Sequence, residues 1–295
     1  MSLINSIFEQ LLNGLRTGSI YALIALGYTM VYGIAKMINF AHGDIIMVGA
    51  YSLYVFTVLL GLHPVLAVIL TIVVCSVLGI VIEKVAYKPL RNAPSLAVLI
   101  TAIGMSYLLQ NVALLIFKAT PIPFASIISV PSLRLGSVTI SGITIVTLVV
   151  TTISMIALTS FINNTKTGRA MRAVSEDKGA AELMGINVNK TISITFAIGS
   201  GLAAVAGILF ICQYQSLQPT LGALPGIKAF VAAVLGGIGS IPGAMLGGII
   251  LGIIESLSKA YISTQLSDAI VFSTLVIVLL ARPSGLLGKM KIEKV

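Results

Sequence analysis

The sequence predicts an all-α polytopic membrane protein with about eight or nine transmembrane helices, some of them discontinuous. Of its 295 residues, 57% are hydrophobic and 9% are charged, which excludes an ordinary soluble domain. The charge-free run 64–82 is close to the roughly 20 residues that cross a hydrocarbon core of about 30 Å. Most Lys and Arg residues gather in clusters between apolar runs, as they do in loops on one face of a membrane. We expect a single transmembrane domain, residues 1–295, embedded in a lipid bilayer.

Nine apolar runs are expected to cross the membrane. They cover residues 11–33, 45–60, 64–85, 96–117, 143–162, 191–212, 228–236, the stretch that follows to 261, and 268–281. The run 228–236 is the shortest, so a total of eight is the alternative. Small residues crowd the run 191–212, as close helix packing in lipid requires. No basic n-region precedes the first run, so we expect it to be retained rather than cleaved as a signal. Nine crossings would place the N-terminus outside.

Two stretches interrupt the apolar runs and predict discontinuous helices. The segment AKMINFAHGD, residues 35–44, is too polar for lipid, so protein or a water-filled cavity must surround it. It is either a tight cytoplasmic turn or a broken helix beside a translocation pathway. The segment GGIGSIPG, residues 236–243, contains Pro242, which lacks an amide hydrogen, and glycines that cost a helix about 1 kcal/mol each. A regular helix cannot pass through it.

The net charge of +9 is distributed as expected for membrane topology rather than for nucleic acid binding. Thirteen of the 18 basic residues form four clusters: Lys36; Lys84, Lys88 and Arg91; Lys166, Arg169, Arg172, Lys178 and Lys190; and Arg282, Lys289, Lys291 and Lys294. The positive-inside rule assigns these clusters, and with them the C-terminus, to the cytoplasm. The loop 118–142 has three prolines and alternating apolar residues. We expect it outside, with a short strand pair that could meet an extracytoplasmic partner.

The longest polar interval, residues 163–190, is expected to be a cytoplasmic loop that carries a short helix. Ser175 can cap the N-terminus of this helix. Glu176 and Asp177 then fall in its first turn, where the helix dipole favours acids. Gly185 can end it in a left-handed conformation, after about two and a half turns.

The surface of this expected helix bears on its role. Ala180, Ala181 and Met184 can share one side, where the two alanines would let another protein approach closely. Arg169 and Arg172 flank that approach. A short exposed helix has no core of its own, so it either packs against its own bundle or docks a cytoplasmic partner.

Three separated runs carry a resemblance to a known family. They are GSIYALIALGYTMVYGIAKMINFAHGDIIMVGAY (18–51), GRAMRAVSEDKGAAELMGI (168–186) and GIKAFVAAVLGGIGSIPGAMLGGIILG (226–252). The second run resembles the EAA-type cytoplasmic loop by which permease subunits of ABC importers engage their ATPase subunits. The first and third, with the ending RPSGLLGK, resemble the LivH-type permeases of branched-chain amino acid importers. The runs occur in the order expected for that family.

The resemblance implies the transmembrane permease subunit of an ATP-driven ABC importer in a bacterial inner membrane, with leucine, isoleucine and valine as substrates. It also implies a homologous second permease as heterodimer partner, two cytoplasmic ABC ATPases that bind the ATP, and a periplasmic substrate-binding protein. The chain itself would hold no cofactor. The residues implied to couple to the ATPases are Gly168, Arg169, Arg172, Glu176, Asp177, Ala180, Ala181, Gly185 and Ile186.

Ionisable residues inside membrane segments are candidates for a translocation pathway. With neighbouring polar and glycine positions in the two breaks, the candidates are Asn39, His42, Gly43, Asp44, Gly237, Gly239 and Glu255. His42 beside Asp44 is either a hydrogen-bonded helix cap or a pathway contact. Glu255 lies four residues before Lys259, so it is either half of a self-neutralised pair near the outer interface or a pathway group.

Enzyme motifs are absent from the sequence. It has no HExxH, CxxC, phosphate-binding GxxxxGK[ST], dinucleotide-binding GxGxxG between a strand and a helix, or intramembrane protease GxGD or GxSG. Cys75 and Cys212 lie far apart in apolar runs, with neither a disulfide framework nor a metal-ligand spacing. We therefore expect a transport protein that does not hydrolyse ATP itself. The alternatives are a related permease for urea or short-chain amides, and a self-sufficient channel or secondary transporter whose polar loop is a regulatory cap.

Overall fold

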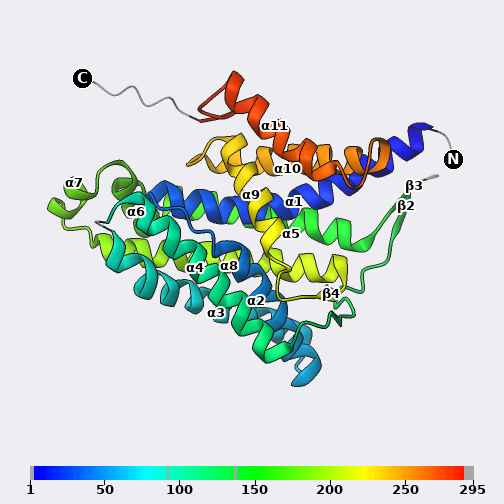
Figure 1. Cartoon of the computed structure of the whole chain (residues 1–295), viewed down its shortest axis with the longest axis horizontal. Helices are drawn as coiled ribbons and strands as arrows, with labels where there is room; N and C mark the ends of the chain where they lie inside the picture. The colour runs from blue at the N-terminus through cyan, green and yellow to red at the C-terminus, as the bar shows by residue number, and fades with distance from the viewer. Residues whose placement is uncertain (1–2, 92, 136–137, 289–295) are drawn as a thin grey trace.

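The computed structural model describes residues 3–91, 93–135 and 138–288, which form a helical bundle with two small two-stranded sheets (Figure 1). The elements run in the order α1 (Leu3–Ala35), α2 (His42–Tyr54), η1 (Val55–Leu59), α3 (Pro64–Ile82), η2 (Glu83–Tyr87), η3 (Lys88–Leu90), α4 (Ser95–Phe117), β1 (Ile122–Pro123), β2 (Leu133–Leu135), β3 (Val138–Ile140), α5 (Gly142–Asn164), α6 (Lys166–Glu176), α7 (Lys178–Leu183), α8 (Val188–Tyr214), β4 (Ser216–Leu217), α9 (Ala223–Gly236), α10 (Ile241–Tyr261) and α11 (Ser267–Ala281). The all-α fold class expected from the sequence is confirmed.

Each of the nine apolar runs expected to cross the membrane forms a helix in the described part of the chain. Seven helical segments there are long and apolar enough to cross a membrane. The other two, α9 and α11, have 14 and 15 residues. At about 1.5 Å per residue they fall short of a hydrocarbon core of about 30 Å. The run 228–236, expected to be the shortest crossing, lies in α9. It therefore belongs to one of two short apolar helices.

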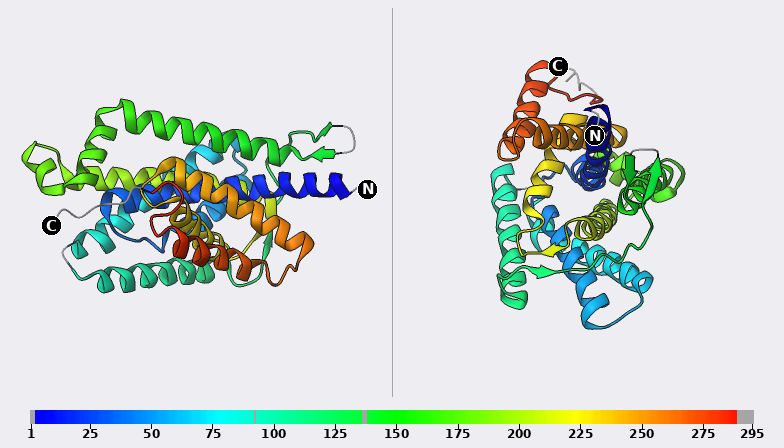
Figure 2. Two further views of the ribbon diagram at one scale, coloured as in Figure 1. Left: turned by 90° about the horizontal axis from the view of Figure 1, so that it is seen from above. Right: turned by 90° about the vertical axis from the view of Figure 1, so that its right-hand side faces the viewer.

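α1 is the central helix, and its most extensive contact is with α10 (Figure 2). The two helices run antiparallel, with Gly14 and Gly18 of α1 against Ile253 and Ile249 of α10. Because the glycines lack side chains, the backbones approach closely: a Cβ atom on Gly18 would lie 2.7 Å from the Cα of Ile249. In lipid, contacts of this kind stabilise helix pairs through van der Waals packing.

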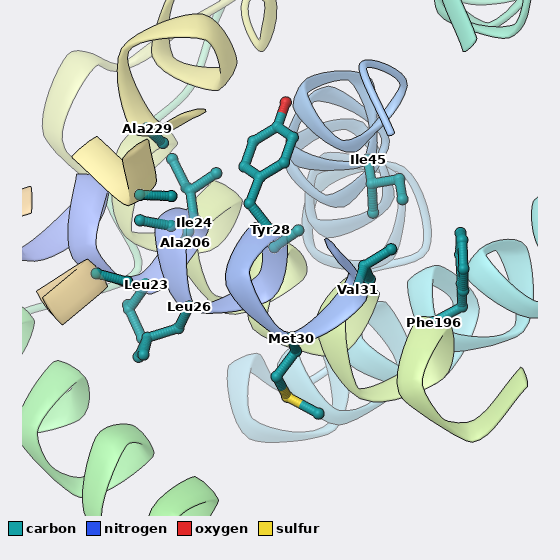
Figure 3. Packing of buried hydrophobic residues seen from close by; sticks show 14 of the residues in the cluster. Leu23, Ile24, Leu26, Tyr28, Met30, Val31, Ile45, Phe196, Ala206 and Ala229 are labelled. Atoms are coloured by element: carbon teal, nitrogen blue, oxygen red, sulfur yellow. The ribbon is translucent and has the colours of Figure 1, made fainter. Parts of the chain in front are cut away.

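α8 is the second inner helix and contacts α1, α2 and α3. Its small residues lie against the backbones of these helices, with Gly199 next to Gly27 of α1 and Gly207 next to Ile46 of α2. The expectation that the run 191–212 is buried by small-residue packing is confirmed. Figure 3 shows the apolar side chains of α1, α2 and α8 that share this core.

The loop 118–142 contains the strand pair expected from its alternating pattern. β2 and β3 pair antiparallel, with Leu133 opposite Ile140. β1 pairs antiparallel with β4, with Ile122 opposite Leu217, so the loop is also attached to the segment that follows α8. β2 and β3 lie at the end of the molecule that carries the N-terminus (Figure 1).

The opposite end of the bundle holds α6, α7, the C-terminus of α1 and the η2–η3 segment, and we call it the α7 end (Figure 1). Lys178 of α7 donates a hydrogen bond from Nζ to the carbonyl oxygen of Ala35, the last residue of α1, at 3.1 Å. Arg91, which follows η3, binds the Asn189 side chain at the start of α8. The basic clusters around Lys36, Arg91 and the α6–α7 segment therefore share one end of the molecule.

The last described residues, 282–288, also return to the α7 end. The Leu286 amide donates to the carbonyl of Leu235, near the end of α9, at 2.9 Å. Gly33 of α1 lies against Gly239, just beyond α9. Arg282, from the fourth basic cluster, follows α11 on this side. The other members of that cluster, Lys289, Lys291 and Lys294, lie outside the described residues.

Candidate functional site

The α6–α7 segment contains two capped helices rather than one. α6 begins after Thr165, whose Oγ1 accepts a hydrogen bond from the Gly168 amide at 3.0 Å. α7 begins after Asp177, whose Oδ1 accepts hydrogen bonds from the amides of Gly179 and Ala180 at 2.8 and 3.0 Å. Each cap satisfies amide groups that have no intrahelical partner.

The start expected for the short helix of this segment was wrong. Ser175 lies in the last turn of α6, where its hydroxyl donates to the Arg172 carbonyl at 2.7 Å. Glu176 ends α6, and Asp177 is the cap of α7 rather than a first-turn acid, because its carboxylate accepts both free amides. α7 is therefore six residues long. Gly185, with a φ of 80°, has the left-handed conformation expected beyond the helix.

The exposed apolar surface of this segment lies at the C-terminal end of α7. Leu183 and Met184 are 91% and 82% exposed. Ala180 is also exposed, whereas Ala181 is 3% exposed and packs into the bundle. The expected shared face of Ala180, Ala181 and Met184 forms only in part. The Met184 amide donates to the Ala180 carbonyl at 3.1 Å and both residues are exposed, whereas Ala181 is buried against the bundle. Leu183 and Met184 are thus the large side chains available to a partner.

The remaining expected coupling residues divide into packed and exposed positions. Gly168 is buried, and a Cβ atom there would lie 2.4 Å from the Cα of Ile162 in α5. Ile186 is half-buried, and its amide donates to the Ala181 carbonyl at 3.0 Å. The exposed members are Arg169, Arg172, Glu176 and Asp177. α6 is consequently held against α5 by its glycine while its charged side chains reach solvent.

Lys178 links α7 to α1, and sequence reasoning did not single it out. Its Nζ contacts the Ala35 carbonyl oxygen at 3.1 Å. Partial burial, with the positive charge of Arg91 nearby, lowers the pKa of Lys178 below its usual value. One lysine among many basic residues in a loop carries no pattern that would predict such a contact.

The first break enters the bundle interior, as a broken helix would, instead of forming a tight turn. α1 stops before Lys36, which has a φ of 59°. Asn39 is 2% exposed, and its Oδ1 accepts a hydrogen bond from the Tyr87 hydroxyl at 2.9 Å. His42 is buried, and its ring lies 4.6 Å from the ring of Tyr28 on α1.

His42 does not cap α2, so that interpretation was wrong. Ala41 occupies the N-cap position, and no side chain makes a capping hydrogen bond there. Nε2 of His42 and Nδ2 of Asn39 are buried without a hydrogen-bond partner among the described residues. A small cavity lies beside them, lined also by Tyr28 and Phe230. Buried polar groups without partners are candidates to contact water or a permeating molecule.

α2 and α9 both begin inside the bundle. Gly43, in the first turn of α2, lies against Gly222 and Gly226 at the start of α9. A Cβ atom on Gly222 would lie 1.9 Å from the Gly43 carbonyl oxygen, so no side chain fits between the two helix starts. A Cβ atom on Gly226 would lie 3.7 Å from the Tyr28 hydroxyl of α1. The two helix starts therefore meet beside Tyr28 of α1, inside the bundle. Discontinuous helices in transporters typically meet in this way.

Asp44 connects this meeting point to α4. Its carboxylate is buried, and Oδ1 accepts a hydrogen bond from Nε2 of Gln110 at 2.8 Å. Nε2 of Gln110 also contacts Oγ of Ser106 at 3.3 Å. α4 has the lowest buried fraction among the candidate membrane spans. The Asp44 contact therefore holds a sparsely packed helix to α2.

The second break is a glycine turn between α9 and α10 at the α7 end. Gly237 and Gly239 have φ angles of 102° and 95°, which residues with a Cβ atom rarely adopt. Gly237 also lies against Gly288. Ile238, between them, lines the same small cavity as His42. The two breaks are thus adjacent in space although about 200 residues separate them in sequence.

Glu255 belongs to a charged cluster that joins four helices. The expected pair is present, with Lys259 Nζ 2.5 Å from Glu255 Oε1. Lys228 of α9 binds the same oxygen at 2.8 Å and an Asp268 oxygen of α11 at 2.6 Å. The Tyr21 hydroxyl of α1 donates to Glu255 Oε2 at 2.7 Å. The paired interpretation is confirmed, and the pair extends to α1, α9 and α11.

Replacing Glu255 with leucine is expected to lower the free energy of unfolding by roughly 3 kcal/mol, the lower end for breaking a buried ion pair, because the buried Lys228 ammonium loses Glu255 but keeps Asp268 as a carboxylate partner. Lys259→Met is the matched control, since its side chain is 42% exposed and losing an exposed pair costs at most about 1 kcal/mol. Thermal unfolding of the purified variants measures both losses. Equal midpoints would contradict a stabilising role for the Lys228 contact.

Cysteine and metal chemistry are not evident in the described ranges. Cys75 and Cys212 are both free and buried. No group of three or more His, Cys, Asp or Glu side chains in those ranges is arranged to hold a metal ion.

Comparison with known proteins identifies the architecture. Residues 10–279 match the family described as "Branched-chain amino acid transport system / permease component". The chain belongs to this family. The match spans both breaks and the α6–α7 segment, and membership makes the chain a multi-pass membrane permease of a transport system rather than an enzyme.

Curated members of the branched-chain permease family match nearly the whole chain. The permease protein BraD of Pseudomonas aeruginosa is 48% identical, over 97% of each chain. The permease protein LivH of Salmonella typhimurium is 46% identical, again over 97% of each chain. The probable permease protein LivH of Methanocaldococcus jannaschii is 31% identical, over 92% of this chain and 89% of its own. The resemblance inferred from the three sequence runs is confirmed.

Proposed function

We propose that this permease is the transmembrane subunit of an ATP-driven importer for leucine, isoleucine and valine, and that α7 docks its ATPase subunits. The exposed pair Leu183 and Met184 carries the proposal. These side chains are 91% and 82% exposed within a polar segment. Large apolar side chains gathered on a polar surface are typical of sites that a partner protein buries. Two ABC ATPases would bind at the α7 end.

Charge supports a cytoplasmic position for the α7 end. Lys36, Arg91 and the basic residues of α6 and α7 share that end, and the positive-inside rule assigns such clusters to the cytoplasm. Arg282, near the C-terminus, would be cytoplasmic as well. The N-terminus and the β2–β3 hairpin would then face the periplasm, where the hairpin offers a surface to a substrate-binding protein (Figure 1). The membrane is the bacterial inner membrane.

The substrate class comes from the relatives and suits the interior at the breaks. BraD and LivH are named as high-affinity branched-chain amino acid transport permeases. Tyr28, Phe230 and Ile238 give the small cavity an apolar lining, which would suit an aliphatic side chain once the cavity widens to admit one. Asn39 and His42 could briefly shield the charged groups of a zwitterion, which hydrocarbon cannot. Tight binding would be left to the separate receptor.

A second, homologous permease would complete the pathway. Only 11% and 17% of the apolar 18-residue stretches of α4 and α5 are buried within this chain. These helices therefore have surface free to face lipid or another membrane subunit. A heterodimer of permeases with two ATPases is the assembly we propose.

Uptake into vesicles containing this chain, the second permease, the ATPases and the binding protein tests the proposed function. We expect uptake of labelled leucine to require ATP and the ATPases, and to be competed by isoleucine and valine. Competition by urea without competition by valine would favour a permease for urea or short-chain amides. Leucine uptake without ATP would contradict the proposal and favour a self-sufficient channel or secondary transporter.

A further inference from the structure

The C-terminus of α1 is capped by a side chain from another segment. The last carbonyl groups of a helix have no intrahelical partner and form the negative end of its dipole. Lys36 is left-handed, with a φ of 59°, so α1 stops at Ala35. The ammonium of Lys178 lies 3.1 Å from the carbonyl oxygen of Ala35. A lysine at this position stabilises the end of α1 by charge and by hydrogen bonding.

The backbone of Lys178 is fixed to α7. Lys178 is the first residue of that helix and directly follows the cap residue Asp177. The Asp177 carboxylate holds the next two amides, those of Gly179 and Ala180. When α7 moves, the Cα of Lys178 must therefore move with it.

Ala35, whose carbonyl accepts this hydrogen bond, directly precedes the first break. After Ala35 the chain passes through Met37 and Asn39, which are 8% and 2% exposed and packed among the helices. Asn39 is bound to Tyr87, and His42 then starts α2 beside the interior of α1. A shift of Ala35 is consequently transmitted along a short, packed segment to the buried polar groups at the break.

We infer that the hydrogen bond between Lys178 and Ala35 couples movement of α7 to the break between α1 and α2. Lys178 is then a positioning residue for transport. The inference rests on the proposed function, because it requires an ATPase that moves α7. Leu183 and Met184 lie at the other end of α7, so docking and transmission depend on different side chains.

Lys178→Met, studied in vesicles with all partner subunits, tests the inference. Methionine keeps an unbranched apolar stem and removes the donors. We expect ATPase association and ATP hydrolysis close to those of the wild type, with leucine uptake per ATP hydrolysed lowered by about tenfold or more, a usual size for coupling between sites. Lys178→Arg keeps the donors and should recover most of the uptake. Lys84→Met, an exposed position at the same end, is the matched control and should retain the wild-type ratio.

Two results would overturn the inference and leave the proposed function intact. One is a wild-type ratio of uptake to ATP hydrolysis in Lys178→Met. The other is loss of ATPase association in that variant, which would make Lys178 a docking residue. Absence of ATPase association with the unmodified permease would instead overturn the proposed function. Lys178→Leu, which also removes the donors, provides the same comparison if the methionine variant is unstable.

Movement of the break itself gives a second readout. Ile38→Cys places a thiol in the segment between Ala35 and Asn39, where Ile38 is half-buried. Its rate of labelling by a hydrophilic maleimide should change on adding ATP when Lys178 is present. The same ATP-dependent change in the Lys178→Met background would show that the hydrogen bond does not transmit the movement.

Discussion

Changing both Leu183 and Met184 to aspartate is expected to abolish ATPase binding by a permease that still folds. The two side chains are 91% and 82% exposed, so they add little to the stability of the bundle. Burying a leucine or methionine in an interface is worth roughly 1.5–3 kcal/mol, so charged replacements of both should weaken association by about 100-fold or more. Co-purification with the ATPases and ATP-driven leucine uptake measure the loss.

Val130 and Leu133 provide the matched control for this variant. They are 46% and 50% exposed and lie in the loop before α5. Changing both to aspartate adds the same charge to exposed apolar positions away from the α7 end. This control variant should still co-purify with the ATPases. Normal co-purification of the variant at Leu183 and Met184 would show that α7 is not the docking element.

Gly222→Val is expected to disable the permease by separating α2 from α9. The new Cβ atom would lie 1.9 Å from the Gly43 carbonyl oxygen, a backbone atom that cannot move without shifting the start of α2. Overpacking of a tight contact costs typically 1–3 kcal/mol, and a clash between two backbones belongs at the upper end of about 3 kcal/mol. The midpoint of thermal unfolding and the rate of leucine uptake should both decrease strongly.

Gly104→Val on α4 controls for the addition of a branched side chain to a membrane helix. A Cβ atom at Gly104 meets nothing within 4 Å, and the position is exposed. Its unfolding midpoint should remain close to that of the wild type. If Gly222→Val were as stable and active as Gly104→Val, the close meeting of α2 and α9 could not be part of the pathway.

Helix positions could be predicted because a bilayer constrains both the length and the composition of its crossings. The small residues of the run 191–212 pointed to the buried helix α8, and Pro242 with its neighbouring glycines marked the turn between α9 and α10. The polar residues around His42 likewise marked the break before α2. Each of these features depends on residues that are close together in the sequence, so the sequence alone predicts it.

Long-range pairing could not be predicted from such signals. Helical spacing suggests that Glu255 pairs with Lys259, but it does not show that Lys228 of α9 binds the same oxygen. The partners of Asn39 and Asp44, Tyr87 and Gln110, are also distant in sequence and unmarked by any motif.

The details of α7 depended on tertiary packing. Ser175 and Asp177 are both good cap residues, and the choice between them is set by where α6 ends. Ala181 became buried because α7 folds back onto the bundle, which left Leu183 and Met184 exposed. A loop sequence alone does not state which of its apolar residues face solvent.

Labelling of Met184→Cys from each side of the membrane tests the central claim, that α7 is a cytoplasmic docking helix. Cys75 and Cys212 are both 0% exposed, so the new thiol should dominate the signal. We predict that a membrane-impermeant maleimide labels it in inside-out vesicles stripped of ATPases, that added ATPases protect it, and that intact cells remain unlabelled. Labelling in intact cells would place α7 outside and contradict the account.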